Sequence, residues 1–180
     1  MQDRFKRIVL VGYMYSGKST LGRHIAAKLG YEFFDTDKEI ENKFRYTVLS
    51  FFKNFREDVF RKAEHEMLKE LLLKDNVVIA TGGGTPCFYG NMEYINNMSL
   101  SVYLQMNVGQ IMSRHAKSKV KRPLLEGKQE DEIKQYITET LAQREQFYLK
   151  ADIVADAFNP DAAKITEDIK KLQKNENLIY

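Results

Sequence analysis

The strongest constraint on the fold of this chain is a short apolar run that leads directly into a glycine-containing turn. Residues 8–20 read Ile-Val-Leu-Val-Gly-Tyr-Met-Tyr-Ser-Gly-Lys-Ser-Thr. Residues 8–11 predict a buried strand, positions 12–19 match Gly-x4-Gly-Lys-Ser, and apolar residues then recur at helical spacing from 21 to 29. A strand, this loop and a helix in that order are the setting that the phosphate-binding P-loop pattern requires. A chance match in a flexible turn is therefore a poor alternative.

The residue types in this loop suit the phosphates of a nucleotide. Gly12 and Gly17 let the backbone approach and wrap the phosphates, and N–H groups at the start of the following helix point at an anion. Lys18 is predicted to place its charge on the β- and γ-oxygens, and Ser19 is predicted to ligate Mg²⁺. The nucleotide-binding residues predicted from the loop are Gly12, Tyr13, Met14, Tyr15, Ser16, Gly17, Lys18, Ser19 and Thr20.

Length and composition indicate one globular domain over residues 1–180. The hydrophobic fraction is 43% and the charged fraction 29%, and no apolar run approaches the length of a membrane span. The N-terminus enters the first strand without room for a signal peptide. A net charge of +3 is too small to indicate nucleic acid or a membrane as partner. We therefore expect a cytoplasmic protein in which the single cysteine, Cys87, is a small packing residue.

Apolar runs alternate with amphipathic stretches along the whole chain. Strands are predicted at 8–11, 31–34, 77–80, 100–104 and 153–155. Helices are predicted at 19–29, 38–43, 47–53, 57–74, 89–96, 108–116, 130–148 and 162–174. This alternation predicts an α/β fold, namely a three-layer α/β/α single domain around a central five-stranded parallel sheet, of the P-loop NTPase type. Ligands are expected at the carboxyl ends of the strands.

The phosphate acceptor must be inferred from elements outside the loop. The chain lacks the Asp-x-x-Gly and Asn-Lys-x-Asp elements of GTPases, and the strand at 77–80 ends without the acid of motor and transport ATPases. Asp35, at the end of the second strand, is therefore the best candidate to help hold Mg²⁺. In Asp35-Thr36-Asp37, one carboxylate can face the metal and the other an acceptor hydroxyl. Turn chemistry with an N-cap for the next helix is an equally good interpretation.

Three further features gain meaning only in combination. Arg61 and Glu64 are three residues apart on one helix face, where the acid can orient the guanidinium, although an exposed surface pair is commoner. The glycines at 82–84 follow a buried strand and either offer backbone N–H groups to a small polar ligand or form a permissive turn. Arg144 alone would pass for a surface residue.

Taken together, these segments resemble the shikimate kinases, which are small P-loop kinases of the nucleoside-monophosphate-kinase type. The resemblance covers essentially the whole chain, and the ordered set is far more specific than any one motif. It rests on residues 12–20, Asp35-Thr36-Asp37, Phe60-Arg61-x-x-Glu64, Gly82-Gly83-Gly84, Arg122-Pro123-Leu124-Leu125 and Arg144-x3-Tyr148.

The resemblance implies a reaction. The γ-phosphoryl group of ATP would pass to the 3-hydroxyl of shikimate, giving shikimate 3-phosphate and ADP on the way to chorismate and the aromatic amino acids. Mg²⁺ would be held by Ser19 and Asp35, and Lys18 would neutralise charge on the phosphates. Asp37 would hydrogen-bond the acceptor hydroxyl, aim it and take its proton. A monomer is expected.

The resemblance also implies an acceptor pocket. Arg61 and Arg144 would grip the substrate carboxylate, a task that suits the guanidinium fork, and Glu64 would hold Arg61 in place. Phe52 and Phe60 would wall the apolar face of the ring. The full set implied for the acceptor is Asp37, Phe52, Phe60, Arg61, Glu64, Gly82, Gly83, Gly84 and Arg144.

A lid at about residues 114–128 is implied as well. Arg122 would close with it over ATP, exclude water and add positive charge to the phosphoryl group in transfer. Arg114 would stack on adenine, with His115 as the competing candidate because this stretch is about one residue longer than is usual in the family.

Departures from the family pattern and rival functions complete the prediction. Tyr13 and Tyr15 stand where the family usually has smaller or less aromatic residues; because only the backbone is needed there, they are expected to contribute little specificity. One rival is a gluconate kinase, which shares the P-loop and also binds a carboxylate. The other is a nucleotide-binding module without catalysis, which the presence of Lys18, Asp37 and Arg122 disfavours.

Overall fold

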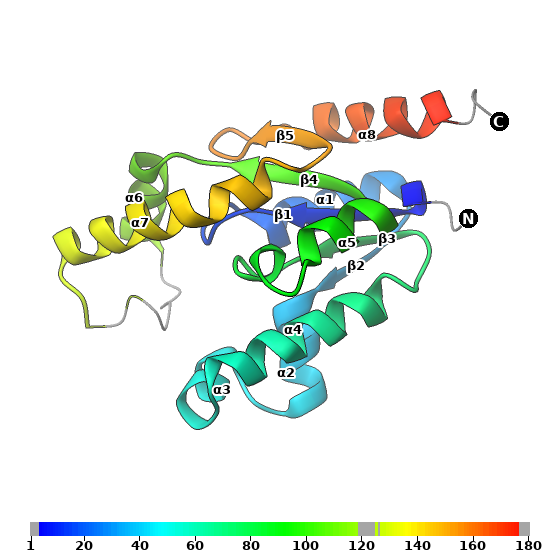
Figure 1. Ribbon diagram of the computed structural model, residues 1–180. Coiled ribbons are helices and arrows are strands. Elements are labelled where there is room, and N and C mark those ends of the chain that lie inside the picture. Colours follow the sequence, from blue (N-terminus) through cyan, green and yellow to red (C-terminus); the bar gives the residue numbers. More distant parts are fainter. Residues whose placement is uncertain (1–3, 119–124, 126, 177–180) are drawn as a thin grey trace.

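Five parallel strands form one sheet in the order β2-β3-β1-β4-β5 in this computed structural model, which describes residues 4–118, 125 and 127–176 (Figure 1). Every pair of neighbouring strands runs parallel. The strands are β1 (Arg7–Val11), β2 (Glu32–Asp35), β3 (Val77–Ala80), β4 (Leu100–Gln105) and β5 (Ile153–Asp156). The five-stranded parallel sheet predicted from the sequence is confirmed.

Helices cover both faces of this sheet. Helix α1 packs on β1, β2 and β3 and against α8, and α5 packs on β4. Figure 1 shows α5 and α7 in front of the sheet and α1 behind it. The helices are α1 (Lys18–Leu29), α2 (Thr36–Phe44), α3 (Val48–Asn54), α4 (Glu57–Leu71), α5 (Asn91–Met98), α6 (Val108–Lys117), α7 (Glu130–Tyr148) and α8 (Ala162–Glu176), with short 3₁₀ turns η1 (Arg4–Lys6) and η2 (Thr85–Cys87). The predicted α/β/α layering is confirmed. None of the helices in the described ranges has the length and apolar character needed to cross a bilayer.

Strands β1 and β3 are buried along their whole length, because helices pack on both faces of the sheet. Arg7 is the one charged residue of these two strands. Its Nε donates to the Lys74 carbonyl (2.8 Å), and its guanidinium pairs with Asp75. This buried arginine thus ties the start of β1 to the segment that leads into β3.

Helix α4 is shorter than predicted and ends at Leu71 instead of residue 74. The N–H groups of Leu73 and Lys74 donate to carbonyls three residues back, those of Glu70 and Leu71, so the α-helical pattern has ended. Asn76 then adopts a left-handed backbone with a φ of 56°. The helix ends early because the chain must turn here to align β3 with β1.

Strand register brings the important loops to one edge of the sheet. Ala80 of β3 is aligned with Leu10 of β1 on one side and with Asp35 of β2 on the other. The carboxyl ends of parallel strands lie at a common edge of the sheet. The loop after β1 and the glycines after β3 therefore leave the sheet side by side, and Asp35 lies next to them. This edge is where the sequence predicts the ligands.

We expect Gly22→Ala in α1 to destabilise the fold, although alanine favours helices. A Cβ at Gly22 would lie 2.5 Å from a ring carbon of Phe33 and 3.1 Å from Leu10 Cδ1. Overpacking costs roughly 1–3 kcal/mol, whereas the gain in helix propensity is about 1 kcal/mol. Urea unfolding should therefore show a net loss of stability of about 1 kcal/mol.

Gly109→Ala in α6 is the matched control for this prediction. The nearest atom to a Cβ at Gly109 is Asn107 Oδ1 at 3.4 Å, which is an ordinary contact. This variant should be neutral or slightly stabilised. A gain in stability at both glycines would contradict close packing of α1 on the sheet.

Candidate active site

The loop after β1 folds around the amino group of Lys18. Lys18 Nζ donates to the carbonyls of Gly12 (2.8 Å) and Tyr13 (2.9 Å) and to Ser16 Oγ (3.2 Å). Gly12 is required at its position, because its φ is 142° and a Cβ would lie 2.8 Å from the Leu104 carbonyl oxygen. The loop therefore gathers a lysine ammonium and the N-terminus of α1 around one small volume, which is an arrangement suited to phosphates.

Asp35 connects the phosphate loop with helix α2. Its Oδ2 accepts a hydrogen bond from Ser19 Oγ (2.5 Å), and its Oδ1 accepts from the backbone N–H groups of Asp37 and Lys38. Helix α2 consequently starts at Thr36, earlier than the predicted residue 38. The N-cap interpretation and the functional interpretation of the acidic pair thus apply to different residues. Asp35 is the N-cap and also meets Ser19, whereas Asp37 lies in the first helical turn and lines a pocket.

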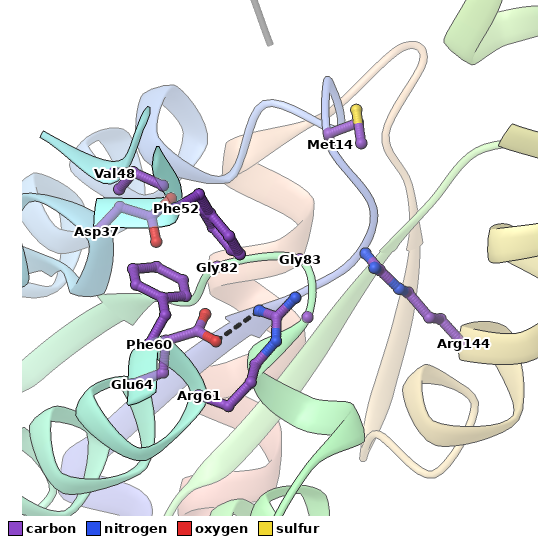
Figure 2. A pocket seen from close by; sticks show the side chains of 11 residues that line it. Met14, Asp37, Val48, Phe52, Phe60, Arg61, Glu64, Gly82, Gly83 and Arg144 are labelled. Carbon is purple, nitrogen blue, oxygen red and sulfur yellow. Dashed lines mark hydrogen bonds and ion pairs between the residues drawn. The ribbon is translucent and has the colours of Figure 1, made fainter. Parts of the chain in front are cut away.

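This pocket lies between the phosphate loop, the glycines after β3 and helices α2, α3, α4 and α7 (Figure 2). It is lined by Met14, Asp37, Val48, Phe52, Phe60, Arg61, Glu64, Gly82, Gly83, Gly84 and Arg144. Figure 2 shows Arg144 on one side and the acids, Arg61 and the two phenyl rings on the other. All residues predicted for the acceptor lie around this one pocket, and their roles in binding stay predictions. Sequence reasoning missed Val48 entirely and expected Met14 only at the nucleotide.

Arg61 and Glu64 form a buried ion pair in the wall of the pocket. Arg61 Nη1 donates to Glu64 Oε2 (2.6 Å), and the side chains are 8% and 2% exposed. Glu57 accepts from Nε and Nη2 of Arg61, and Thr85 donates to the other oxygen of Glu64. Burial by itself would lower the pKa of Arg61, but the carboxylates of Glu64 and Glu57 raise that pKa above its usual value. The alternative of an exposed surface pair is therefore excluded.

The glycines after β3 allow this ion pair to sit close to the backbone. A Cβ at Gly84 would lie 2.5 Å from Arg61 Nη1, and one at Gly82 would lie 2.5 Å from Glu64 Oε1 and 2.9 Å from Asp37 Oδ1. Side chains at these two positions would displace the charged groups of the pocket. The triplet is thus more than a permissive turn.

Three buried side chains that sequence reasoning did not assign a role hold this glycine segment. Thr36 Oγ1 accepts from the Gly82 N–H (2.9 Å), and the Tyr148 hydroxyl donates to the Gly83 carbonyl. Thr85 bridges the segment to α4 through Glu64. Thr36 and Tyr148 lie within the sequence motifs of the candidate site, so the sequence could have drawn attention to them. The contact of Thr85 with the glycine segment could be found only from the fold.

Arg114 and His115 are the two residues predicted to compete for stacking on adenine, and the structure places both beside the phosphate loop. Arg114 Nη1 donates to the Tyr15 carbonyl (2.8 Å), and its Nη2 donates to the carbonyl of Phe158 (3.1 Å) in the loop after β5. His115 Nδ1 is hydrogen-bonded to the Tyr15 hydroxyl (3.0 Å). Both side chains therefore contact the phosphate loop from α6. Arg122 lies outside the described residues, as do residues 119–124 and 126 of the predicted lid.

The parallel sheet, the phosphate loop after β1 and the pocket beside that loop define a P-loop kinase that acts on a small molecule. The family model for shikimate kinase matches residues 14–174. The chain therefore belongs to the shikimate kinase family.

Similar proteins support the same assignment along nearly the whole chain. A curated shikimate kinase from Bacteroides thetaiotaomicron is 40% identical over 169 residues, which are 93% of this chain and 97% of the relative. A crystal structure of shikimate kinase from that organism has a TM-score of 0.84 and 40% identity, covering 95% of this chain and 98% of the other. Shikimate kinase from Acinetobacter baumannii in complex with shikimate has a TM-score of 0.83 and 33% identity, with 96% and 95% covered.

Cys87, in η2 beside the pocket, is expected to react slowly with alkylating agents. Burial raises the pKa of its thiol to about 11, so roughly one thiol in a thousand is ionised at pH 8. Iodoacetamide should label the folded protein about a hundredfold more slowly than protein unfolded in guanidinium, where the pKa of cysteine is about 8.5. The folded rate should still be rising at pH 10. Equal rates in the folded and unfolded chain would contradict the raised pKa.

Proposed function

We propose that this chain transfers the γ-phosphoryl group of ATP to the 3-hydroxyl of shikimate, giving shikimate 3-phosphate and ADP. The proposal places the reaction in one catalytic domain over residues 1–180, acting as a monomer in the cytoplasm. The observation that supports it best is the composition of the pocket beside the phosphate loop. Two arginines face each other across a space walled by Phe52 and Phe60, which matches a carboxylate on a ring.

Arg61 is well suited to bind the substrate carboxylate. A guanidinium carries five N–H donors, and within the described residues three of them are bonded to Glu57 and Glu64. One N–H on each Nη therefore remains for a bidentate contact with a carboxylate. Arg144 faces the same space from α7 and adds a second positive charge.

Asp37 is the proposed partner of the acceptor hydroxyl. It lies in the first turn of α2 and lines the pocket, where a Cβ at Gly82 would lie 2.9 Å from its Oδ1. A carboxylate there can accept a hydrogen bond from the hydroxyl, orient its oxygen toward the γ-phosphorus and accept its proton. A bond then forms between this oxygen and the γ-phosphorus, the bond from that phosphorus to the bridging oxygen breaks, and ADP carries away the charge.

The phosphates and their metal are assigned to the loop and Asp35. Ser19 and Asp35 present hard oxygen ligands next to each other, and Mg²⁺ in kinases binds through one or two such groups together with phosphate oxygens and water. Bound there, Mg²⁺ would offset negative charge on the phosphates. Lys18 contributes charge on the β- and γ-oxygens, Arg114 is proposed to stack on adenine, and Arg122 is proposed to close over the site.

The proposal is tested by acceptor-dependent release of ADP. Purified protein with ATP and Mg²⁺ should release ADP when shikimate is added, and the product should carry phosphate on the 3-hydroxyl by ³¹P and ¹H NMR. Gluconate and nucleoside monophosphates serve as alternative acceptors, because small P-loop kinases of other specificity would use them. Release with gluconate and none with shikimate would overturn the assignment.

Asp37→Asn should lower kcat with shikimate by about 10²–10⁴-fold, because the amide cannot accept the proton. Affinity for ADP in calorimetry should change less than twofold, since Asp37 faces the acceptor. Glu39→Gln removes the same charge from the same turn of α2 outside the pocket and is the matched control. Full turnover in Asp37→Asn would show that Asp37 acts only in the local structure of the helix.

A further inference from the structure

Tyr13 of the phosphate loop reaches across to helix α7. Its side chain is 1% exposed, and its hydroxyl is hydrogen-bonded to Thr140 Oγ1. Its ring lies under the guanidinium of Arg144, with Arg144 Cζ 5.7 Å from the ring centroid. Thr140 and Arg144 are four residues apart on α7, so they lie on one face of that helix. One tyrosine therefore contacts both residues on the side of α7 that faces the loop.

The backbone of the same residue belongs to the nucleotide site. The Tyr13 carbonyl accepts hydrogen bonds from Lys18 Nζ (2.9 Å) and from the Ser16 N–H (3.3 Å). Its neighbour Met14 lines the acceptor pocket, where a Cβ at Gly83 would lie 3.5 Å from Met14 N and 3.8 Å from Arg144 Nη1. The guanidinium of Arg144 thus lies at the junction of the two sites, beside the loop that carries Tyr13.

We propose that Tyr13 is a positioning residue for the acceptor, because its ring holds the Arg144 guanidinium at the pocket and its hydroxyl holds α7 against the phosphate loop. This inference rests on the proposed function, in which Arg144 binds the substrate carboxylate. It also assigns specificity to a loop residue whose side chain is expected, from the sequence alone, to contribute little.

The two arginines of the pocket are held in different ways. Arg61 is paired with the carboxylates of Glu57 and Glu64, whereas Arg144 forms no ion pair with a carboxylate in the described ranges. The negative face of an aromatic ring attracts a cation without occupying its N–H groups. The hydroxyl of Tyr13 is neutral at physiological pH, because the usual pKa of tyrosine is about 10 and burial raises it further. Arg144 is also hydrogen-bonded to the Tyr148 side chain. Because the ring of Tyr13 occupies no N–H group, the remaining donors of Arg144 are left for a carboxylate ligand.

The experiment compares Michaelis constants for the two substrates in variants of Tyr13. Tyr13→Leu should raise KM for shikimate about five- to tenfold, the size of effect that a partly buried cation–π contact supports. KM for ATP should stay within twofold, because the backbone carbonyl remains. Tyr13→Phe keeps the ring and should raise KM for shikimate less than threefold. In an Arg144→Met background, Tyr13→Leu should add no further increase.

Tyr103→Phe is the matched control. Tyr103 is a fully buried tyrosine whose hydroxyl also bonds α7, through Glu145 (3.1 Å), without a ring contact to Arg144. The Tyr103→Phe variant should have the same KM for shikimate and the same KM for ATP as the wild type.

A second comparison is used if Tyr13→Leu does not fold. Variants with phenylalanine and with pentafluorophenylalanine at position 13 have side chains of the same shape, but fluorination removes the negative face of the ring. KM for shikimate should then rise with fluorination.

Several outcomes would overturn the role of Tyr13. These are an unchanged KM for shikimate in Tyr13→Leu, a parallel rise in both Michaelis constants, or equal values for the phenylalanine and fluorinated rings. Failure of the proposed function is recognised separately, because the wild type would then release no ADP with shikimate. If another carboxylate acceptor is phosphorylated instead, the same comparison with that acceptor decides the role of Tyr13.

Discussion

The pairing of β1 with β3 is the constraint on which the rest of the site depends. With Leu10 level with Ala80, the phosphate loop and the glycine segment leave the sheet together, and the pairing of β2 with β3 adds Asp35 beside them. This register also sets the position of Lys18 relative to Asp35, because Lys18 follows β1 in the chain and Asp35 ends β2.

Around this edge, the pocket is built from side chains that act on one another. Thr36 holds Gly82, and the glycine segment in turn leaves room for Arg61 and Glu64. On the opposite side, Tyr13 brings α7 and Arg144 toward the phosphate loop. The proposed nucleotide and acceptor sites consequently share structural elements, which suits a reaction that depends on placing a hydroxyl in line with a phosphorus.

Much of the fold and of the pocket could be predicted from the sequence. The five strands and the long helix at 130–148 follow from hydrophobic period, and the acidic pair and the glycines stand directly after strands whose ends meet. Helix ends were less predictable. Asp35 starts α2 two residues earlier than expected, and the chain leaves the α-helical pattern of α4 before residue 74. The Asp35 cap is local, but the same carboxylate also bonds Ser19, and the turn at Asn76 leads into the pairing of β3 with β1.

Local patterns in the sequence were enough to establish the class of fold, the phosphate loop and the family, because strand and helix periods and the loop spacing are properties of short segments. Burial of the Arg61–Glu64 pair, the contact of Tyr13 with Arg144 and the entry of Met14 and Val48 into the pocket were not accessible in this way. Each depends on which helix faces which loop across the sheet edge. That relation is set by packing of the whole core, because Tyr13 and Arg144, and the segments that bury the Arg61–Glu64 pair, are separated by many positions in the chain.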